Sequence, residues 1–295
     1  MLLFKGPRDQ LLSPLQSVCG IVEKRHTLPI LSNVLMEKDG EKLTLLATDI
    51  EIQITTQTPT VGAEKAAMTV GARKLQDILR SLPESAEVSL ALDDKRLQLK
   101  AGKSRFNLQT LPAEDFPRMT TADGQSSKLS VTQKQMKRLL GLVQYAMAQQ
   151  DIRYYLNGLL LVAKGSELRM VATDGHRLAY AAETLPNAPA PIEVILPRKT
   201  VLELSRQLAD NDDPLEITLT PTQARFSFGS IELVSKLIDG KFPDYERVIP
   251  QHHSKLIKLS RDTLLHSLLR AAILTNEKFR GVRLVLGAGS LKIIS

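Results

Sequence analysis

Three side chains within four consecutive residues could act together in chemistry. Asp174, Gly175, His176 and Arg177 place a carboxylate, an imidazole and a guanidinium within one short segment. Such a set could hold a metal ion or act on a phosphodiester. The chain contains five His, and no two of them have the His-x-x-x-His spacing that puts two ligands on one helix face. The sequence therefore predicts no metal site.

Motifs for other catalytic chemistry are missing from the sequence. There is no Gly-x-x-x-x-Gly-Lys-Ser/Thr or Gly-x-Gly-x-x-Gly loop for a nucleotide, and no Gly-x-Ser-x-Gly elbow for a serine nucleophile. We therefore expect a non-catalytic protein with no catalytic residue and no cofactor. The competing hypothesis from another class is an enzyme that uses His176, Asp174 and nearby Arg residues on phosphodiesters.

The composition is typical of a soluble globular protein, with 43% hydrophobic and 24% charged residues. No apolar run is long enough to span a membrane, and the N-terminus lacks the features of a secretion signal. Cys19 is the only cysteine, which excludes an internal disulfide and fits a reducing cytoplasm.

The net charge of +7 is unevenly distributed along the chain. Residues 1–127 hold 16 Lys/Arg and 16 Asp/Glu, and residues 128–252 hold 15 and 14. Residues 253–295 hold 8 and 2, so most of the excess lies there. Total charge is therefore weak evidence for a nucleic-acid partner, and the local distribution matters more.

The sequence repeats itself with a period of one domain. Leu43–Asp49 returns as Leu168–Asp174, and Arg73-Lys74 returns as Arg198-Lys199, both 125 residues later. Phe116-Pro117 returns 126 residues later, and the Arg8-Asp9-x-Leu11-Leu12 pattern returns 253 residues later from Arg261. A period of this length can bury its own core, so the chain is predicted to contain tandem copies of one fold.

The period sets the expected domains, which are 1–125, 126–252 and an incomplete third copy over 253–295. Residues 120–127 and 250–254 have linker composition. A complete third copy would need roughly 80 more residues. We therefore expect the chain to be a fragment of a longer protein, truncated within its third domain.

Each copy shows the same pattern of elements. It begins with a helical periodicity, which in the second copy runs through Met136, Leu139, Leu140 and Val143 and is preceded by Ser130 as a plausible N-cap. Short alternating runs follow, then a second helical pattern near 75–82 or 201–208, then more alternating runs. The predicted fold class is α+β, with two helices on antiparallel sheet in each copy.

Five longer segments carry a resemblance to a known family: Thr27–Leu31, Gln150–Gly158, Ala172–Ala179, Phe242–Val248 and Asn276–Arg283. With these motifs in this order, the chain from Met1 to Ser295 resembles the beta subunit of bacterial DNA polymerase III, the sliding clamp family. The resemblance implies three similar domains per subunit and two subunits that close head to tail into a ring around duplex DNA. Helices would line the hole, and sheets would form the outer wall.

The resemblance also implies the function and the partners. The expected protein is a processivity factor for DNA replication in the cytoplasm, and polymerase activity belongs to partner subunits. The expected partners are double-stranded DNA, the polymerase catalytic subunit, the clamp loader, mismatch-repair and translesion proteins, and a second copy in a homodimer. No membrane is involved.

A DNA-contacting surface is expected on the helices and one loop. Sequence-independent DNA binding requires cations directed at phosphates, and the predicted helices carry Arg73, Lys74 and Arg138. The resemblance adds Arg25, Gln150, Arg153, Tyr154, Tyr155 and Lys199. The plain alternative is that each cation only solvates a helix face and that the tyrosines pack beneath their loop.

A peptide-binding groove is also implied by the resemblance, and it receives short extended motifs of partner proteins. Its residues here are Leu156, Thr173, Gly175, His176, Arg177, Leu178, Pro243, Arg247 and Val248. In the family, residues near the C-terminus complete this groove, and they are missing here. The plain alternative makes Leu156, Leu178 and Val248 core residues.

The first copy provides a control for this segment. It keeps Ala47-Thr48-Asp49 but continues with Ile50-Glu51. Asp49 and Asp174 are therefore interpreted as scaffold, and Gly175–Leu178 are what the second copy adds.

A subunit interface is the last surface that the resemblance implies. It would join the first domain of one chain, through Lys74, Lys103, Arg105, Phe106 and Leu108, to Ile273 and Leu274 of another. The apolar pairs are expected to be exposed, with charged rims. A third functional hypothesis remains, in which the chain is only a peptide-binding module and never encloses DNA.

Overall fold

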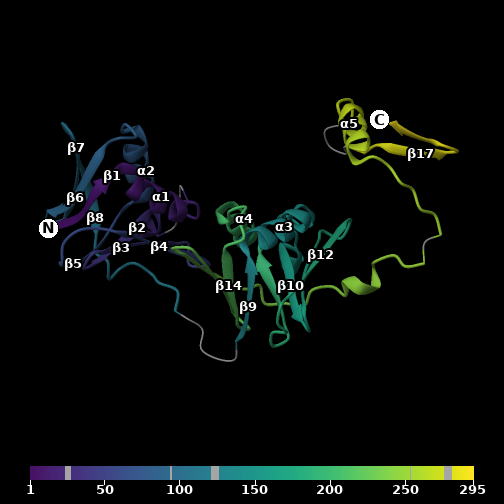
Figure 1. Ribbon diagram of the computed structural model, residues 1–295, viewed down its shortest axis with the longest axis horizontal. Coiled ribbons are helices and arrows are strands. Elements are labelled where there is room, and N and C mark those ends of the chain that lie inside the picture. The colour runs from purple at the N-terminus through teal and green to yellow at the C-terminus, as the bar shows by residue number, and fades with distance from the viewer. Residues whose placement is uncertain (24–27, 94, 121–125, 253, 276–280) are drawn as a thin grey trace. The chain divides into compact units, whose positions relative to one another are not determined.

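The computed structural model describes residues 1–295 apart from 24–27, 94, 121–125, 253 and 276–280 (Figure 1). It divides into two compact units, Met1–Pro243 and Asp244–Ser295. Among the helices so described, none is long and apolar enough to cross a membrane.

The first copy has the order strand, helix, four strands, helix, three strands. Its elements are β1 (Leu2–Pro7), α1 (Arg8–Cys19), β2 (Asn33–Asp39), β3 (Lys42–Thr48), β4 (Ile52–Pro59), β5 (Lys65–Gly71), α2 (Ala72–Ser81), β6 (Glu87–Asp93), β7 (Arg96–Ala101) and β8 (Ser104–Leu111). A short 3-10 helix, η1 (Pro29–Ser32), precedes β2.

The second copy repeats this order. Its elements are β9 (Ser127–Thr132), α3 (Gln133–Val143), β10 (Gly158–Lys164), β11 (Glu167–Thr173), β12 (Leu178–Thr184), β13 (Ile192–Pro197), α4 (Arg198–Gln207), β14 (Pro214–Leu219), β15 (Gln223–Phe228) and β16 (Ile231–Lys236). Two 3-10 helices, η2 (Gln144–Ala146) and η3 (Tyr154–Leu156), lie between α3 and β10. The predicted α+β fold in tandem copies is confirmed.

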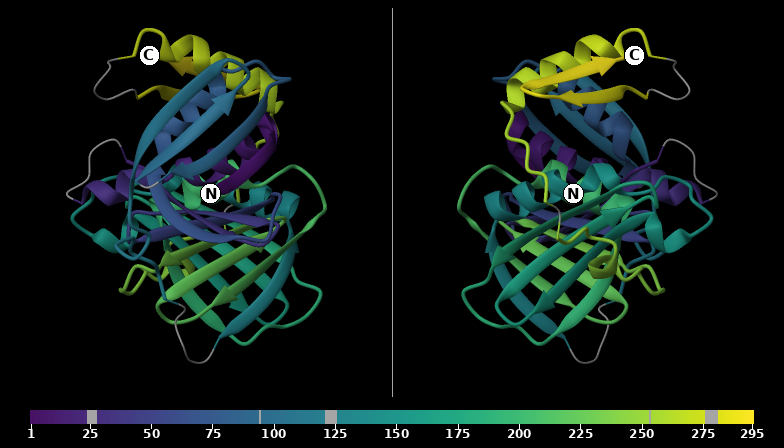
Figure 2. Two further views of the ribbon diagram at one scale, coloured as in Figure 1. Left: turned by 90° about the vertical axis from the view of Figure 1, so that its left-hand side faces the viewer. Right: turned by 90° about the vertical axis from the view of Figure 1, so that its right-hand side faces the viewer.

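The two copies are joined strand to strand. β16 pairs antiparallel with β4, from Ser235 opposite Ile52 to Glu232 opposite Thr55. The result is one twelve-stranded sheet in the order β1-β6-β7-β8-β5-β2-β3-β4-β16-β15-β14-β9, and a separate four-stranded sheet β12-β11-β10-β13. Figure 2 shows the strands and helices of the chain from two sides. The joint lies within the first unit and gives both copies a common sheet.

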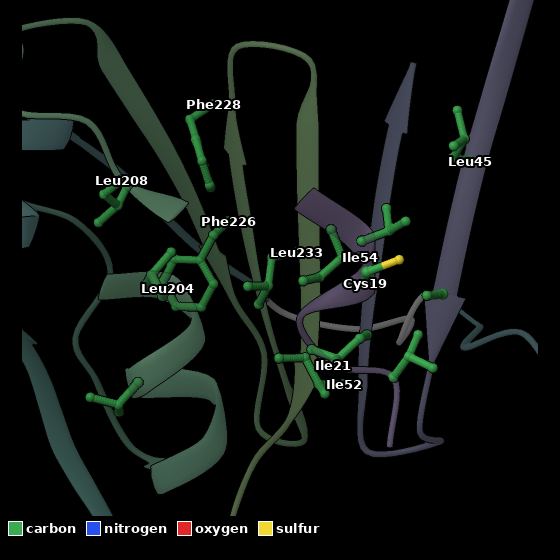
Figure 3. Close-up of a cluster of buried hydrophobic side chains, with 14 of the residues drawn as sticks. Cys19, Ile21, Leu45, Ile52, Ile54, Leu204, Leu208, Phe226, Phe228 and Leu233 are labelled. Atoms are coloured by element: carbon green, nitrogen blue, oxygen red, sulfur yellow. The ribbon is translucent and has the colours of Figure 1, made fainter. Parts of the chain in front are cut away.

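The core is continuous across this joint. α1 packs on α2, β3 and β4, while α3 packs on α4, β11 and β12. Ile52 and Ile54 of β4 belong to the same buried cluster as Phe226 and Leu233 of the second copy (Figure 3). Each large apolar side chain removed from water in this way contributes about 1.5–3 kcal/mol to folding.

Helix α1 continues through Pro14. Proline has no N–H, so it leaves the carbonyl of Gln10, four residues earlier, without its helical donor. The Thr58 hydroxyl on β4 donates to that carbonyl at 2.8 Å. The sheet therefore satisfies the acceptor that the proline leaves open.

The predicted N-cap of α3 is wrong by two residues. Thr132 caps the helix in a capping box with Gln135, because its hydroxyl accepts from the Gln135 N–H and its own N–H donates to the Gln135 side chain. Ser130 lies within β9 and donates to Glu216 on β14. The strand runs directly into the helix, so the cap belongs to the last strand residue.

The second unit contains η4 (Tyr245–Arg247), α5 (Arg261–Ala272) and a hairpin of β17 (Arg283–Gly287) and β18 (Ser290–Ile294). The predicted third opening helix is therefore present as α5. Of the residues described in this unit, Tyr245 alone is buried, and Leu265 and Leu269 of α5 are exposed. Two strands cannot cover the helix as the four-stranded sheet does in the second copy.

Candidate functional site

The turn between β11 and β12 is built by two side chains. The carboxylate of Asp174 accepts from the N–H groups of His176 at 2.9 Å and Arg177 at 3.0 Å. The Thr173 hydroxyl donates to the Arg177 carbonyl at 2.7 Å and accepts from the Gly175 N–H at 3.1 Å. Gly175 has φ +86°, a conformation that favours glycine.

The matching turn of the first copy has the same scaffold. Asp49 accepts from the N–H groups of Glu51 at 2.9 Å and Ile52 at 2.8 Å. Thr48 donates to the Ile52 carbonyl at 2.9 Å, and Ile50 takes a positive φ of 71°. The interpretation of Asp49 and Asp174 as scaffold is confirmed, because both form the same turn with different residues on it.

The Arg177 guanidinium is held by Asp174 and Tyr145. Its Nε donates to Asp174 at 3.0 Å, and its Nη2 donates to the carbonyl of Tyr145 at 2.6 Å. The guanidinium also lies over the Tyr145 ring, with its carbon 5.5 Å from the ring centroid. Sequence reasoning missed Tyr145, because it follows α3 with nothing in the pattern to link it to residue 177.

The charge of Asp174 follows from these contacts. Burial raises the pKa of Asp174. The N–H groups of His176 and Arg177 and the Arg177 guanidinium together lower it by more, so the pKa lies below its usual value. His176 is exposed on the turn, and the described residues contain no cluster of three His, Cys, Asp or Glu suited to a metal ion. The geometry is that of a polar turn closed by its own hydrogen bonds.

The remaining residues predicted to line a peptide groove fall into three settings. Leu156 is buried and Leu178 is half-buried, so the core interpretation holds for Leu156. Pro243 is exposed at the end of the first unit. Arg247 and Val248 belong to the second unit, where both are exposed and Arg247 pairs with Asp244 at 2.8 Å.

The loop from Gln149 to Leu156 lies beside the Asp174 turn. The Arg153 guanidinium binds both carboxylate oxygens of Asp151, at 3.0 and 2.8 Å, and donates to the Asp174 carbonyl at 3.3 Å. Hydrogen bonds from the Arg153 guanidinium and backbone N–H lower the pKa of Asp151 to about 2. The loop and the turn are therefore in direct contact.

The predicted DNA-contacting residues of this loop are accessible to different degrees. Gln150 is exposed with φ +57°, and Tyr154 is 58% exposed. Tyr155 is half-buried and meets Tyr154 edge to face, with centroids 5.8 Å apart. Ile152 is 97% exposed. Sequence reasoning missed it because it belongs to no apolar periodicity.

The helix cations are also accessible. Arg73 and Lys74 are exposed at the start of α2, and Arg73 donates to the Val22 carbonyl at 2.5 Å. Arg138 on α3 pairs with Glu183 at 2.6 Å. Arg25 lies outside the described residues.

Lys199 at the start of α4 is bound within the protein. Its ammonium contacts Asp49 at 2.5 Å and Glu23 at 2.7 Å, both in the first copy. Burial lowers its pKa, but these two carboxylates outweigh burial and hold the pKa above its usual value. A DNA phosphate would have to compete with them for this cation.

The residues expected at a subunit interface lie on α2 (Lys74), on or just before β8, and after α5. Between Ser104 and Gln109, β8 pairs with β7 only, and its pairs with β5 begin at Thr110, so this stretch is an edge. Lys103 and Arg105 are exposed, as are Ile273 and Leu274. The expectation that Phe106 and Leu108 are exposed is wrong, because both are half-buried against the core, where alternate β8 positions turn inward.

Comparison with known proteins matches the chain to one family along almost all of its length. Residues 2–120, 130–244 and 246–295 match the N-terminal, central and C-terminal domains of the DNA polymerase III beta subunit. The beta sliding clamps of Pseudomonas putida and Escherichia coli are 47% and 45% identical, over 98% of this chain and 79% of theirs.

Solved structures agree with the sequence matches. The DNA polymerase III subunit beta of Pseudomonas aeruginosa superimposes with a TM-score of 0.93 at 46% identity, over 99% of this chain and 80% of that one. A second structure of the Pseudomonas aeruginosa clamp, bound to griselimycin, also has a TM-score of 0.93 at 46% identity, over 99% of this chain and 79% of that one.

Proposed function

Since the chain belongs to the DNA polymerase III beta subunit family of sliding clamps, we propose that it uses two surfaces, one for duplex DNA and one for partner peptides. Members of this family are non-catalytic processivity factors, so polymerase activity belongs to partner subunits. The observation that carries the proposal is the match over 98% of the chain, together with two copies of one domain on a common sheet.

The DNA surface consists of the helix cations and the loop beside the Asp174 turn. Arg73 and Lys74 are exposed at the start of α2, and Arg138 is exposed in the middle of α3. Gln150, Arg153 and Tyr154 are exposed on the loop. Arg25, Tyr155 and Lys199 complete the proposed set. Lys and Arg side chains neutralise phosphates without reading bases, which suits a clamp that must move along any sequence.

The peptide surface is the groove at the Thr173–Leu178 turn. The turn presents Arg177 as a donor, with Leu178 half-buried beside it. Thr173, Gly175, His176 and Pro243 of the first unit complete the proposed set, with Leu156 buried in the core of that unit. Arg247 and Val248 of the second unit are proposed separately as peptide contacts. A fixed donor beside apolar walls suits an extended segment with apolar anchors. Griselimycin, which the Pseudomonas aeruginosa clamp binds, serves as its probe here.

The proposed partners are the polymerase catalytic subunit, the clamp loader, and mismatch-repair and translesion proteins. A second copy would close the ring through the β8 edge with Lys74, Lys103 and Arg105, against Ile273 and Leu274. We also propose the domain bounds 1–125, 126–252 and 253–295, and action in the cytoplasm, which the lone buried thiol of Cys19 supports.

Primer extension tests the function. With purified polymerase and clamp loader on a primed circular template, the chain should lengthen the product of a single polymerase binding event. Products of the same length with and without the chain would contradict the proposal. Metal-dependent DNA hydrolysis that is lost in His176→Ala would instead favour the enzyme hypothesis.

A further inference from the structure

Arg153 belongs to the proposed DNA surface and also contacts the turn of the proposed groove. Its Nε and Nη2 bind the two carboxylate oxygens of Asp151 on the loop, and Nη2 also donates to the carbonyl of Asp174 in the groove turn. The carboxylate of that same Asp174 binds the Nε of Arg177. A single chain of hydrogen bonds therefore runs from the loop to the groove donor.

Gly175 provides the space for this contact. A Cβ atom at Gly175 would lie 2.9 Å from Nη1 and 3.0 Å from Nη2 of Arg153, so the guanidinium packs against the bare glycine. A larger residue would displace Arg153 from the turn.

The first copy shows that the two residues belong together. Leu28 of the first copy occupies the position of Arg153, which lies 125 residues later. The Leu28 carbonyl accepts from the N–H of Leu31, and the Arg153 carbonyl accepts in the same way from the N–H of Leu156. Ile50 occupies the position of Gly175 on the same scaffold. The second copy thus differs at both positions, with an arginine in one and the space for it in the other.

We propose that Arg153 is a positioning residue that couples the two surfaces. Bound to Asp151 and Asp174, it fixes the turn that presents Arg177, and a DNA phosphate that takes up its guanidinium weakens the peptide groove. The inference rests on the proposed function, because it needs both surfaces to have their ligands.

The geometry allows this exchange. The Arg153 side chain is 45% exposed, so a phosphate can reach it. Exposed ion pairs such as Arg153–Asp151 contribute little stability, whereas a guanidinium binds phosphate through two parallel hydrogen bonds. The same donors cannot serve the phosphate and Asp151 together, so the two states exclude each other.

The first test measures griselimycin affinity by calorimetry. Arg153→Ala should weaken binding by about 3- to 10-fold, because the groove turn is no longer held by the guanidinium. Arg153→Lys should weaken it equally, because an ammonium cannot form the two-point contact with Asp151. Arg169→Ala is the matched control, since Arg169 forms the same i, i+2 ion pair with Glu167 at the other end of β11. It should bind like the unmodified protein.

A double-mutant cycle separates positioning from general damage. If Arg153 acts through Asp174 on Arg177, adding Arg153→Ala to Arg177→Ala should change affinity by less than about 2-fold. A saturating short duplex should weaken griselimycin binding to the unmodified protein and leave binding to Arg153→Ala unchanged.

The outcomes distinguish the inference from the function on which it rests. Absence of griselimycin binding by the unmodified protein, or full binding by Arg177→Ala, would contradict the proposed groove. The coupling alone would be overturned if Arg177→Ala weakens griselimycin binding as expected but one of three results is found for Arg153→Ala. It binds griselimycin as well as Arg169→Ala does, its loss of affinity adds fully to that of Arg177→Ala, or duplex DNA still weakens its griselimycin binding.

Discussion

The ammonium of Lys199 in the second copy lies 2.5 Å from the carboxylate of Asp49 in the first. One oxygen of Asp49 accepts the two N–H groups of its own turn, and the other accepts from Lys199. Asp49 is nearly buried, so this ion pair is placed where water screens it little. The residue that shapes the β3–β4 turn therefore also ties the two copies together.

Lys199→Ala should lower the free energy of unfolding by about 1–2 kcal/mol, because it leaves a nearly buried carboxylate without its charged partner. Urea denaturation measures the change. Lys236→Ala is the control, since Lys236 also crosses between the copies but pairs with an exposed Glu51 at 3.0 Å. It should cost less than about 1 kcal/mol. Equal small losses of stability in both variants would show that the Lys199–Asp49 pair stabilises the fold no more than an exposed ion pair does.

Arg177→Ala should weaken griselimycin binding by about 1–3 kcal/mol, the usual loss for a charged hydrogen-bond donor, and leave the salt dependence of DNA binding unchanged. Lys74→Ala combined with Arg138→Ala should leave griselimycin binding unchanged. It should flatten the salt slope of DNA binding by about two, because each substitution leaves one phosphate without its cation. Titrations against griselimycin and against duplex DNA at several salt concentrations distinguish the two. A double variant that loses both activities equally while remaining folded would argue against two surfaces.

Gly175→Ala should weaken griselimycin binding and lower stability by about 1 kcal/mol, because the backbone is left-handed and the new methyl meets Arg153. Gly165→Ala is the matched control, with φ +57° and no atom within 4 Å of the added Cβ. It should show a similar backbone cost in thermal unfolding but bind griselimycin normally. If Gly165→Ala weakens binding as much, the packing of Arg153 on the glycine is irrelevant to the groove.

The Asp151–Arg153 pair should survive to low pH. The folded pKa of Asp151 is lowered from 3.8 to about 2, so the contribution of this pair is fully present above pH 3.8 and is lost as the pH falls toward 2. Carboxyl NMR should place the Asp151 midpoint near pH 2, and in Arg153→Ala it should return toward the ordinary value. A midpoint that the variant does not move would mean that Arg153 is not its partner.

The repeat made most of the fold predictable. The order of elements in the second copy follows from the first because the spacing of Leu43–Asp49 and Arg73-Lys74 is kept 125 residues later. The pairing of β16 with β4 was not predictable, because Ile52–Pro59 alternates like any other strand and nothing local selects its partner. The cap at Thr132 was missed because the strand enters the helix without an intervening turn.

The candidate site was only partly predictable. Comparing the two copies identified Asp174 as scaffold, since Asp49 stands in the same motif without the residues that follow. The contact between Arg153 and Asp174 depends on the backbone angle of Gly175 and on how the loop folds back, which no spacing encodes. The ion pair of Lys199 with Glu23 joins residues 176 positions apart, so sequence reasoning could treat Lys199 only as an available cation.

Retention on circular DNA tests the central claim most directly. The protein is loaded onto a nicked circular plasmid by the clamp loader, and the fraction that coelutes with DNA on gel filtration is measured before and after one restriction cut. A clamp that encircles DNA should coelute with the intact circle and be released once the circle is linear, because its hold is topological. Equal retention, or equal loss, on circular and linear DNA would contradict the account.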